Sequence, residues 1–208
     1  MKDPYRNIAG IYDRLFENMN RGLRVAGIRM FRPRKGMNIL DVGCGTGSHL
    51  ELYQRYECNL YGIDLSPSML EVARLRLGDS IQLDLGSATN MPYDDHKFDL
   101  IISMLSLHEM GHQTRSGVLS EMKRVLKDDG RILLIDFHPG PYRPLQGWIS
   151  KLIIFFSELA AGREHFENYR QFMATKGLST LATLHDLEVE KQNILAGGTF
   201  AVYLVTPK

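Results

Sequence analysis

Short apolar runs alternate along the chain with stretches in which apolar residues recur at helical spacing. Five short runs read as strands, and the run at 98–103 is nearly all apolar, as a strand covered on both faces should be. These runs cover residues 38–42, 60–63, 81–85, 98–103 and 131–136. The helical stretches between them cover residues 48–56, 66–77 and 115–127. Strands that alternate with helices predict an α/β fold built on a mainly parallel sheet.

Both ends of the chain extend this pattern. Apolar residues from position 8 to 26 recur at helical spacing, with charged residues on the opposite side, which predicts an N-terminal helix. A further helix is predicted at 166–175, ending at Gly177, and two strands at 187–194 and 199–205 form an antiparallel pair around a Gly-Gly turn. The prediction is therefore a Rossmann-like seven-stranded sheet, mainly parallel with one antiparallel strand, and with helices on both faces.

The segment that follows the fifth strand departs from the alternation. A helix predicted at 145–161 has apolar residues over more than one stripe, Trp148 among them. Such a helix must face something besides the sheet, whether a hydrophobic substrate, a bilayer surface or a second subunit. We expect residues 1–208 to form a single domain, in which residues 1–36 are a helical cap and residues 139–165 a helical lid.

Composition removes several classes of function. The chain has 25 Lys and Arg against 24 Asp and Glu, so no net field attracts it to nucleic acid. Its longest strongly apolar run, residues 152–156, is far shorter than the roughly 20 residues that a membrane span requires. Cys44 and Cys58 are its two cysteines, too few for a disulfide framework. The N-terminus is charged and lacks an apolar segment. Together with the preceding features, it predicts a cytoplasmic protein.

One local charge pattern keeps a membrane contact open. Between Arg21 and Lys35 the chain has six basic residues and no acid. A solvated helix face is the ordinary reason for such a run, and recognition of a phosphate or of an anionic membrane surface is the alternative. We therefore expect a cytoplasmic protein that either stays free of membranes or binds them peripherally.

The strongest chemical signal lies in residues 38–50, NILDVGCGTGSHL, where a strand, a glycine turn and the start of a helix follow one another. The glycines are Gly43, Gly45 and Gly47. They permit φ angles that other residues avoid and let a ligand approach the backbone, while the helix N-terminus offers N–H groups. A dinucleotide fingerprint would have its last glycine at the position of Ser48, so this spacing disfavours an NAD oxidoreductase.

An acidic residue at the end of the next strand completes this pattern. Asp64 lies about 20 residues beyond the glycine turn, where a carboxylate can accept hydrogen bonds from both hydroxyls of a ribose. Ser66 then reads as an N-cap, and Pro67 as the first residue of the helix that follows. The glycine turn and Asp64 together predict a site for an adenosine-containing cofactor.

At these residues the chain resembles the class I S-adenosylmethionine (SAM) dependent methyltransferases, whose first motif is an acid followed by G-x-G-x-G. The resemblance covers nearly the whole chain and is closest to the ubiquinone/menaquinone-biosynthesis C-methyltransferase-like branch, the methyltransferase type 11 group. It rests on YDRLFENMNRGLR, LDVGCGTG, GIDLSPSML, VLKDDGRILLIDF and a Gly-Gly hairpin near the C-terminus. It implies SAM as the cofactor, S-adenosylhomocysteine (SAH) as the product, no metal, and in-line methyl transfer.

The resemblance also implies which residues hold the cofactor. These are Tyr12, Asp41, Gly43, Gly45, Thr46, Gly47, Asp64, Leu65, Met69, Ser87, Ala88 and Ser103. Tyr12 has an ordinary core position as its alternative reading, and so does Met69. The family commonly has an acid before the alanine that corresponds to Ala88, to bind the adenine amino group. Ser87 stands there in this chain and brings no charge, which leaves Asp84 as an alternative partner.

Three residues are candidates for proton transfer. They are His108, His138 and Asp136. His108 is the first candidate for a base, because an unperturbed imidazole has a pKa of about 6.5; a histidine on a helix surface is the alternative. Asp136 lies at the carboxyl end of the fifth strand, and with His138 it would form an acid or base pair over the substrate, unless either has a capping or structural role. Glu109 and His112 bring no third ligand at metal-binding spacing, so no metal site is predicted.

Several functions remain open after these assignments. We expect methyl transfer to a small hydrophobic acceptor such as a quinol, phenol or thiol. A phospholipid or ethanolamine-type N-methyltransferase at a membrane surface is the closest alternative, and a non-catalytic SAM-binding module is another. Nucleic-acid base methylation is disfavoured, because residues 103–106 lack an Asn/Asp-Pro-Pro-aromatic motif and neither cysteine has the setting of a nucleophile. The expected partner is a small-molecule or lipid substrate, with a homodimer left open.

Overall fold

The computed structural model describes residues 3, 5–6, 9–141 and 162–208. Within residues 11–19 it describes the backbone alone. The predicted helix at 145–161, and with it most of the predicted lid, therefore lies outside the described residues. Among the helices in the described ranges, none has both the length and the apolar character needed to cross a membrane.

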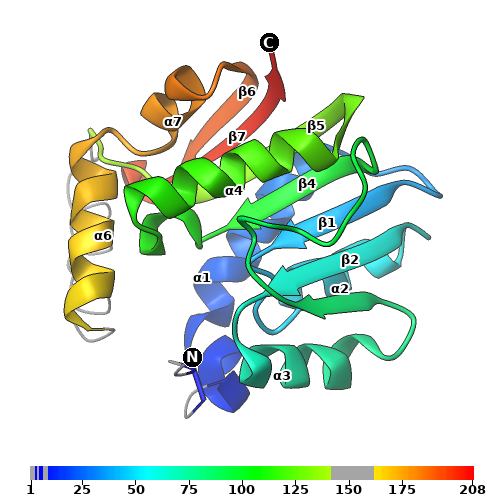
Figure 1. The fold of residues 1–208 in the computed structure, drawn as a ribbon. Coiled ribbons are helices and arrows are strands. Elements are labelled where there is room, and N and C mark those ends of the chain that lie inside the picture. Colours follow the sequence, from blue (N-terminus) through cyan, green and yellow to red (C-terminus); the bar gives the residue numbers. More distant parts are fainter. Residues whose placement is uncertain (1–2, 4, 7–8, 142–161) are drawn as a thin grey trace.

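Seven strands form one sheet in the order β3-β2-β1-β4-β5-β7-β6 (Figure 1). The strands are β1 (Asn38–Val42), β2 (Asn59–Asp64), β3 (Gln82–Leu85), β4 (Phe98–Met104), β5 (Leu126–Phe137), β6 (Leu187–Leu195) and β7 (Phe200–Pro207). β7 is antiparallel to both of its neighbours. The other pairs are parallel. The prediction of a seven-stranded, mainly parallel sheet with one antiparallel strand is confirmed.

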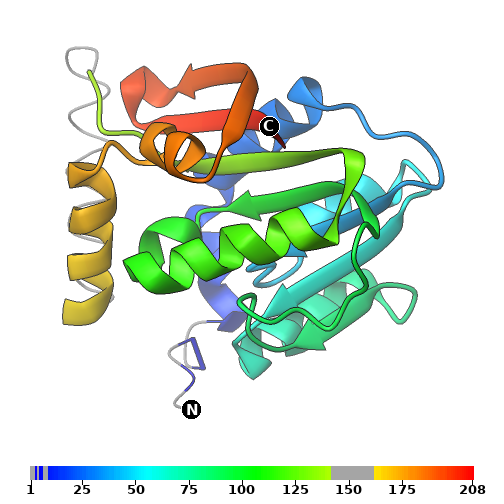
Figure 2. The same cartoon turned by 45° about the horizontal axis from the view of Figure 1, so that its top comes forward.

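Helices cover both faces of the sheet, as predicted. They are α1 (Ala9–Met30), α2 (Ser48–Gln54), α3 (Pro67–Leu77), α4 (His112–Val125), α6 (Arg163–Ala174) and α7 (Leu178–Leu184), with short 3-10 helices η1 (Leu107–Glu109) and η2 (Ala196–Gly198). Figures 1 and 2 show α4 and α7 in front of the sheet and α1 and α2 behind it. α6 stands at one end of the sheet, where it contacts η1.

The core lies between the sheet and these helices, because the central strands are apolar on both sides. Successive residues of one strand are fully buried, for example Ile39 and Leu40 of β1 and Ile101 and Ile102 of β4. Since neighbouring side chains of a strand point to opposite faces, both faces of the sheet must be covered. This arrangement accounts for the nearly continuous apolar runs in the sequence.

The chain leaves α4 earlier than its sequence pattern predicts. The pattern predicts a helix to residue 127, but α4 ends at Val125 and Leu126 already pairs with Phe98 of β4. Leu126 is buried there, and Gly130 makes room for it, because a Cβ atom on Gly130 would lie 2.7 Å from Leu126 Cδ1. The cross-strand contact therefore begins β5 well before the predicted start at residue 131.

Another short element follows Gly177, where the sequence pattern predicts none. Gly177 adopts a φ of 57°, and α7 starts at the next residue. Leu178, Leu181 and Ala182 are buried, and α7 contacts β5, β6 and β7. Seven residues give too few turns for a helical period to stand out, so packing on the sheet rather than the local pattern defines this helix.

The strand order reverses beside β1. This strand pairs in parallel with β2 on one side and with β4 on the other. The connections that leave the two strands therefore run in opposite directions and separate at the carboxyl ends of the strands, which opens a crevice where α/β sheets bind ligands.

Candidate active site

A cavity of about 740 Å³ opens at this crevice. Its walls come from α1, the turn between β1 and α2, the end of β2, the loop after β3, and the region of η1. The volume lies within the range of roughly 300 to 1,000 Å³ that is usual for small-molecule sites. This cavity is therefore the candidate functional site.

Glycine is required in the turn that forms the floor of the cavity. Gly43, Gly45 and Gly47 have φ angles of 73°, 51° and 72°, in the left-handed region that other residues avoid. A Cβ atom on Gly43 would also lie 2.8 Å from the Cβ atom of Ser106, and one on Gly47 would lie 2.6 Å from Leu77 Cδ1. The turn therefore brings the backbone within direct reach of a ligand and cannot do so with side chains in these positions.

Asp64 lies beside this turn at the tip of β2 and lines the cavity. Its Oδ2 accepts a hydrogen bond from the backbone N–H of Gly45, and its Oδ1 accepts one from the N–H of Ser66, both at 2.8 Å. Burial raises the pKa of this carboxyl, while the backbone hydrogen bonds oppose the shift. Each oxygen retains a second lone pair, so a carboxylate held in this orientation can bind two neighbouring hydroxyls of a ribose.

Helix α3 begins next to Asp64 as its sequence predicts. The hydroxyl of Ser66 accepts a hydrogen bond from the N–H of Met69 at 3.1 Å, and Pro67 is the first helical residue. Met69 and Leu65 line the cavity, and Leu65 is 54% exposed although it is a large apolar residue. An apolar side chain left open at a cavity suits the flat face of a purine base.

The loop after β3 closes this side of the cavity with Ser87 and Ala88. The Oγ of Ser87 lies 2.8 Å from the Oγ1 of Thr89 and accepts a hydrogen bond from the Thr89 N–H. Asp84 is not among the described residues that line the cavity, and its carboxylate accepts a hydrogen bond from the Tyr93 hydroxyl instead. Ser87 therefore lies closer to the predicted adenine position than Asp84 does.

The inner end of the cavity holds polar atoms that lack a partner. Asp41, Asn20 and His49 line the cavity, and no hydrogen bond within the described residues reaches Asp41 Oδ1, Asn20 Oδ1 or either ring nitrogen of His49. Burial raises the pKa of Asp41 to about 7, Asp64 adds to the rise, and Arg24 opposes it. Burial also lowers the pKa of His49 to about 3, so this imidazole is neutral. Buried polar groups without partners point to a polar ligand.

A SAM molecule fits this set of partners. Its ammonium group would supply donors to Asp41, and its carboxylate would face the guanidinium of Arg24, which lines the same end of the cavity. Arg24 and Asn20 lie four residues apart on α1, hence on one side of the helix. Sequence reasoning missed both and grouped Arg24 with a solvated basic run, but Arg24 is only 4% exposed. The four-residue spacing between Asn20 and Arg24 was the sequence feature that could have placed both residues on one side of the helix.

The remaining predicted cofactor residues differ in their positions. Thr46 lines the cavity and its oxygens contact Arg76. Ser103 is only 1% exposed, and its Oγ lies 2.8 Å from the Oγ of Ser106, which does line the cavity. Tyr12 belongs to α1, and its side chain is outside the described part of the chain. The roles of these three residues stay predictions.

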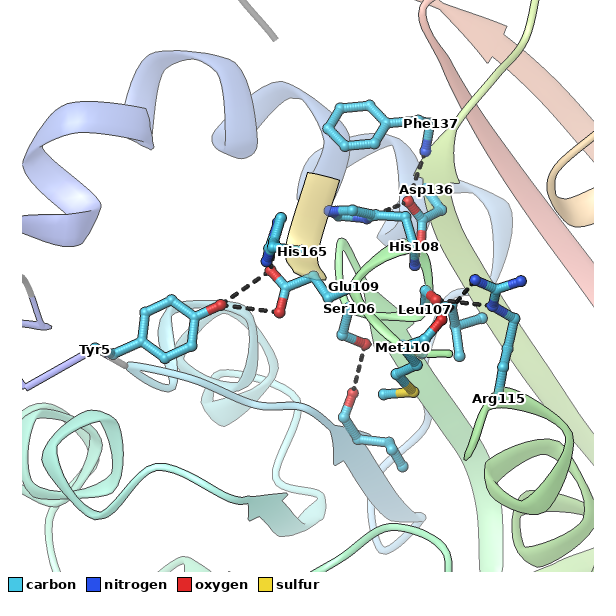
Figure 3. Close-up of polar contacts among 12 residues, drawn as sticks. Tyr5, Ser106, Leu107, His108, Glu109, Met110, Arg115, Asp136, Phe137 and His165 are labelled. Carbon is cyan, nitrogen blue, oxygen red and sulfur yellow. Dashed lines mark hydrogen bonds and ion pairs between the residues drawn. The ribbon is translucent and has the colours of Figure 1, made fainter. Parts of the chain in front are cut away.

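Beside the cavity, the structure pairs Asp136 with a different histidine from the one predicted, and none of the three predicted catalytic residues is among the described residues that line the cavity. Asp136 Oδ1 lies 2.7 Å from His108 Nδ1, and its oxygens also accept hydrogen bonds from the N–H groups of His108 and Phe137 (Figure 3). The predicted pairing of Asp136 with His138 is wrong. The backbone N–H of His138 donates to the carbonyl of Thr199, and Nδ1 of its ring lies 3.0 Å from the carbonyl oxygen of Gly198.

His108 is also not a helix-surface histidine, since it is 3% exposed and packs against Phe137. A buried guanidinium holds the backbone on either side of it. Arg115 donates to the carbonyl of Leu107 at 2.9 Å and to that of Met110 at 2.6 Å (Figure 3). Its guanidinium also lies over the ring of Phe172. Arg115 therefore positions η1, a role that its sequence position inside a predicted helix did not reveal.

Replacing Arg115 with methionine is expected to lower the free energy of unfolding by about 2 to 4 kcal/mol, because two buried carbonyl groups would lose their donors. Urea denaturation measures the change. Arg163→Met is the matched control, since Arg163 is exposed and contacts only Glu167 among the described residues. Equal stability of the two variants would contradict a structural role for Arg115.

Comparisons with known proteins agree with this geometry. Residues 40–134 match the protein family described as Methyltransferase domain. A demethylmenaquinone methyltransferase of Clavibacter sepedonicus is 33% identical over 143 residues, which cover 66% of this chain and 58% of that protein. A ubiquinone/menaquinone biosynthesis C-methyltransferase UbiE of Burkholderia orbicola is 26% identical over 97% of this chain and 90% of that protein. The chain spans about three fifths of the length of several curated relatives that it matches.

A solved structure shares the fold. The TehB-like SAM-dependent methyltransferase of Corynebacterium glutamicum superimposes with a TM-score of 0.62 over 96% of this chain and 98% of that one, at 20% sequence identity. The likeness extends over the whole sheet, and the family match includes the glycine turn and Asp64. The chain thus resembles methyltransferases in sequence over residues 40–134 and shares the fold of a SAM-dependent methyltransferase over nearly its whole length.

Proposed function

We propose that this protein transfers the methyl group of SAM in line to a small, mainly hydrophobic acceptor, a quinol, a phenol, a thiol or a similar compound. The observation that carries the proposal is one cavity that is lined both by the glycine turn with Asp64 and by apolar side chains around η1. Those apolar side chains are Met104, Leu105, Met110 and Val118, with Glu109 and Asn168 among the polar residues beside them. Relatives named as demethylmenaquinone methyltransferases, which act on a quinone, support the same acceptor class.

SAM supplies a methyl group that is already activated by its sulfonium, so the chain has mainly to bind and orient. Asp64 and the glycine turn hold the adenosyl part, and Asp41 and Arg24 hold the amino-acid part. Fixing two reactants in this way lowers a barrier by roughly 7 to 11 kcal/mol. Apolar walls at the acceptor end exclude water, which favours the loss of the positive charge during transfer.

An acceptor that arrives protonated needs a base, and His108 is the residue proposed for it. Asp136 Oδ1 lies 2.7 Å from Nδ1 of the imidazole, which leaves Nε2 as the nitrogen that would take the proton. His108 is not among the described residues that line the cavity, but its neighbour Glu109 is. His138 stays the second candidate, although its ring contacts the backbone of Gly198. Replacing His108 with glutamine is expected to lower kcat by about 100-fold or more while SAH binding stays within a factor of about two. His185→Gln, at the C-terminal end of α7, serves as the control.

The proposed domain is single and spans residues 1–208. Residues 1–36 form its cap, a role supported by Asn20 and Arg24 of α1 in the cavity wall. Residues 139–165 form its lid, a role supported only by the apolar pattern of the sequence. The protein is proposed to be cytoplasmic, with peripheral membrane contact through its exposed arginines as the alternative.

A screen of acceptors tests the proposal. Quinol, phenol, thiol, amine and phospholipid acceptors are each incubated with methyl-labelled SAM, and the products are identified by mass spectrometry. Methylation of a quinol, phenol or thiol is the expected result. Methylation of an amine or phospholipid, with binding to anionic liposomes that weakens in salt, would replace the proposal with a lipid N-methyltransferase. SAH binding without any methylated product would replace it with a non-catalytic SAM-binding module.

A further inference from the structure

Three side chains with nitrogen and oxygen donors meet beside the cavity, and one of them, Glu109, belongs to its lining. His108 and Glu109 come from η1, and His165 comes from α6 (Figure 3). One ligand atom from each residue lies within 4.8 Å of the other two. His108 is buried and the other two are half-buried, so the cluster is not a set of solvated surface groups. Two imidazoles and a carboxylate are a donor set that zinc takes in proteins.

The imidazole of His108 is held as a metal-binding histidine usually is. Its Nδ1 lies 2.7 Å from Asp136 Oδ1, so the coordinating atom would be Nε2. Asp136 is itself oriented by the N–H groups of Phe137 and His108. A carboxylate behind a histidine fixes the ring and raises its basicity as a ligand, and such pairs recur in zinc sites.

The other two ligands come from two different elements, Glu109 from η1 and His165 from α6. The hydroxyl of Tyr5 donates to both carboxylate oxygens of Glu109, and His165 Nε2 lies 4.0 Å from Glu109 Oε1. Bonds of 2.0 to 2.2 Å to a tetrahedral ion place ligand atoms roughly 3.3 to 3.6 Å apart. Rotations of the half-buried Glu109 and His165 side chains can supply the required approach of about 1 Å, estimated from those bond lengths.

We propose that His108, Glu109 and His165 bind a divalent transition-metal ion, with zinc as the expected ion. The resemblance to methyltransferases implies no metal. The proposed site is therefore inferred from the residues of this chain alone. Since Glu109 lines the cavity, the remaining coordination position would face the cavity. Coordination would occupy the nitrogen of His108 that the proposed function assigns to the acceptor's proton. Bound zinc is therefore expected to inhibit methyl transfer, and this consequence alone rests on the proposed function.

Calorimetric titration of the untagged full chain with zinc chloride tests the site. One ion per chain is expected, with a dissociation constant in about the micromolar range or tighter. His165→Ala and Glu109→Gln should each weaken binding by at least about 10-fold, and Asp136→Asn by about 10 to 100-fold. His96→Ala is the control for adventitious histidine binding, because His96 is exposed and pairs with Asp128. Absence of zinc binding by the wild type, or unchanged affinity of His165→Ala, would overturn the proposal.

Two further readouts separate a metal site from a structural role of these residues. Cobalt bound in place of zinc should give the visible absorption of a tetrahedral ion with the wild type and lose it with His165→Ala. An octahedral spectrum would contradict the tetrahedral geometry expected for zinc at this site. Zinc should inhibit methyl transfer by the wild type and by His96→Ala, but not by His165→Ala. If no acceptor is methylated, the calorimetric and spectroscopic results still decide whether the ion binds.

Discussion

Replacing Asp64 with alanine is expected to weaken SAH binding by at least about 100-fold. The carboxylate lines the cavity and is oriented by the N–H groups of Gly45 and Ser66. Hydrogen bonds to a charged group contribute about 1.5 to 3 kcal/mol each, so the loss of two bonds to the ribose hydroxyls amounts to about 3 kcal/mol or more. A loss of that size corresponds to a factor of about 100 in the dissociation constant.

Isothermal titration calorimetry with SAH measures this change. Asp84→Ala is the matched control, because Asp84 lies at the end of the neighbouring strand β3, carries the same charge, and points to Tyr93. Asp64→Asn separates binding from folding, since an amide oxygen can still accept one of the two backbone hydrogen bonds. An Asp64→Ala variant that binds SAH as tightly as the Asp84→Ala variant would refute the assignment of Asp64 to the ribose.

The Asp41→Asn variant is expected to be more stable than the wild type without ligand and worse at binding SAH. Burial raises the pKa of Asp41 to about 7, so above neutral pH the ligand-free protein keeps a charge away from water. An asparagine has no such cost, and the free energy of unfolding at pH 8 should rise by about 2 kcal/mol or more. SAH binding should weaken by about 10 to 100-fold, because the ammonium group loses a charged acceptor.

The pH dependence follows from the direction of this shift. A carboxyl whose pKa is higher in the folded than in the unfolded chain stabilises the fold at low pH, and this contribution disappears as the pH rises through about 7. The ligand-free wild type should therefore lose stability between pH 5.5 and 8 relative to Asp41→Asn. SAH binding by the wild type should strengthen over the same interval, because the carboxylate form binds the ammonium group.

Urea denaturation and calorimetry at both pH values measure these two trends. Asp84→Asn is the control, because it makes the same substitution at a carboxylate that does not line the cavity among the described residues. Parallel stability curves for Asp41→Asn and the wild type would show that the buried carboxyl does not titrate in this interval. Unchanged SAH affinity would remove Asp41 from the cofactor site.

Much of the fold was predictable because its signals are local. The apolar run of β1 requires burial on both faces, the glycines after it permit positive φ angles, and Ser66 with Pro67 starts a helix by capping. Each of these effects acts within a few residues, so the amino-acid order carries it directly. The position of Asp64 follows as well, since the end of β2 must lie beside the end of β1 in a parallel sheet.

The pairing of distant residues could not be predicted in the same way. Asn20 and Arg24 reach the cavity only because α1 packs behind the sheet, and His108 meets Asp136 only because η1 lies against the end of β5. His165 joins them from α6, more than fifty residues along the chain. Spacing in sequence says nothing about such contacts, since they depend on the direction in which whole elements pack. The local sequence thus predicted the glycine turn and Asp64. The packing of distant elements determined that Asn20 and Arg24 line the cavity and that His108 pairs with Asp136.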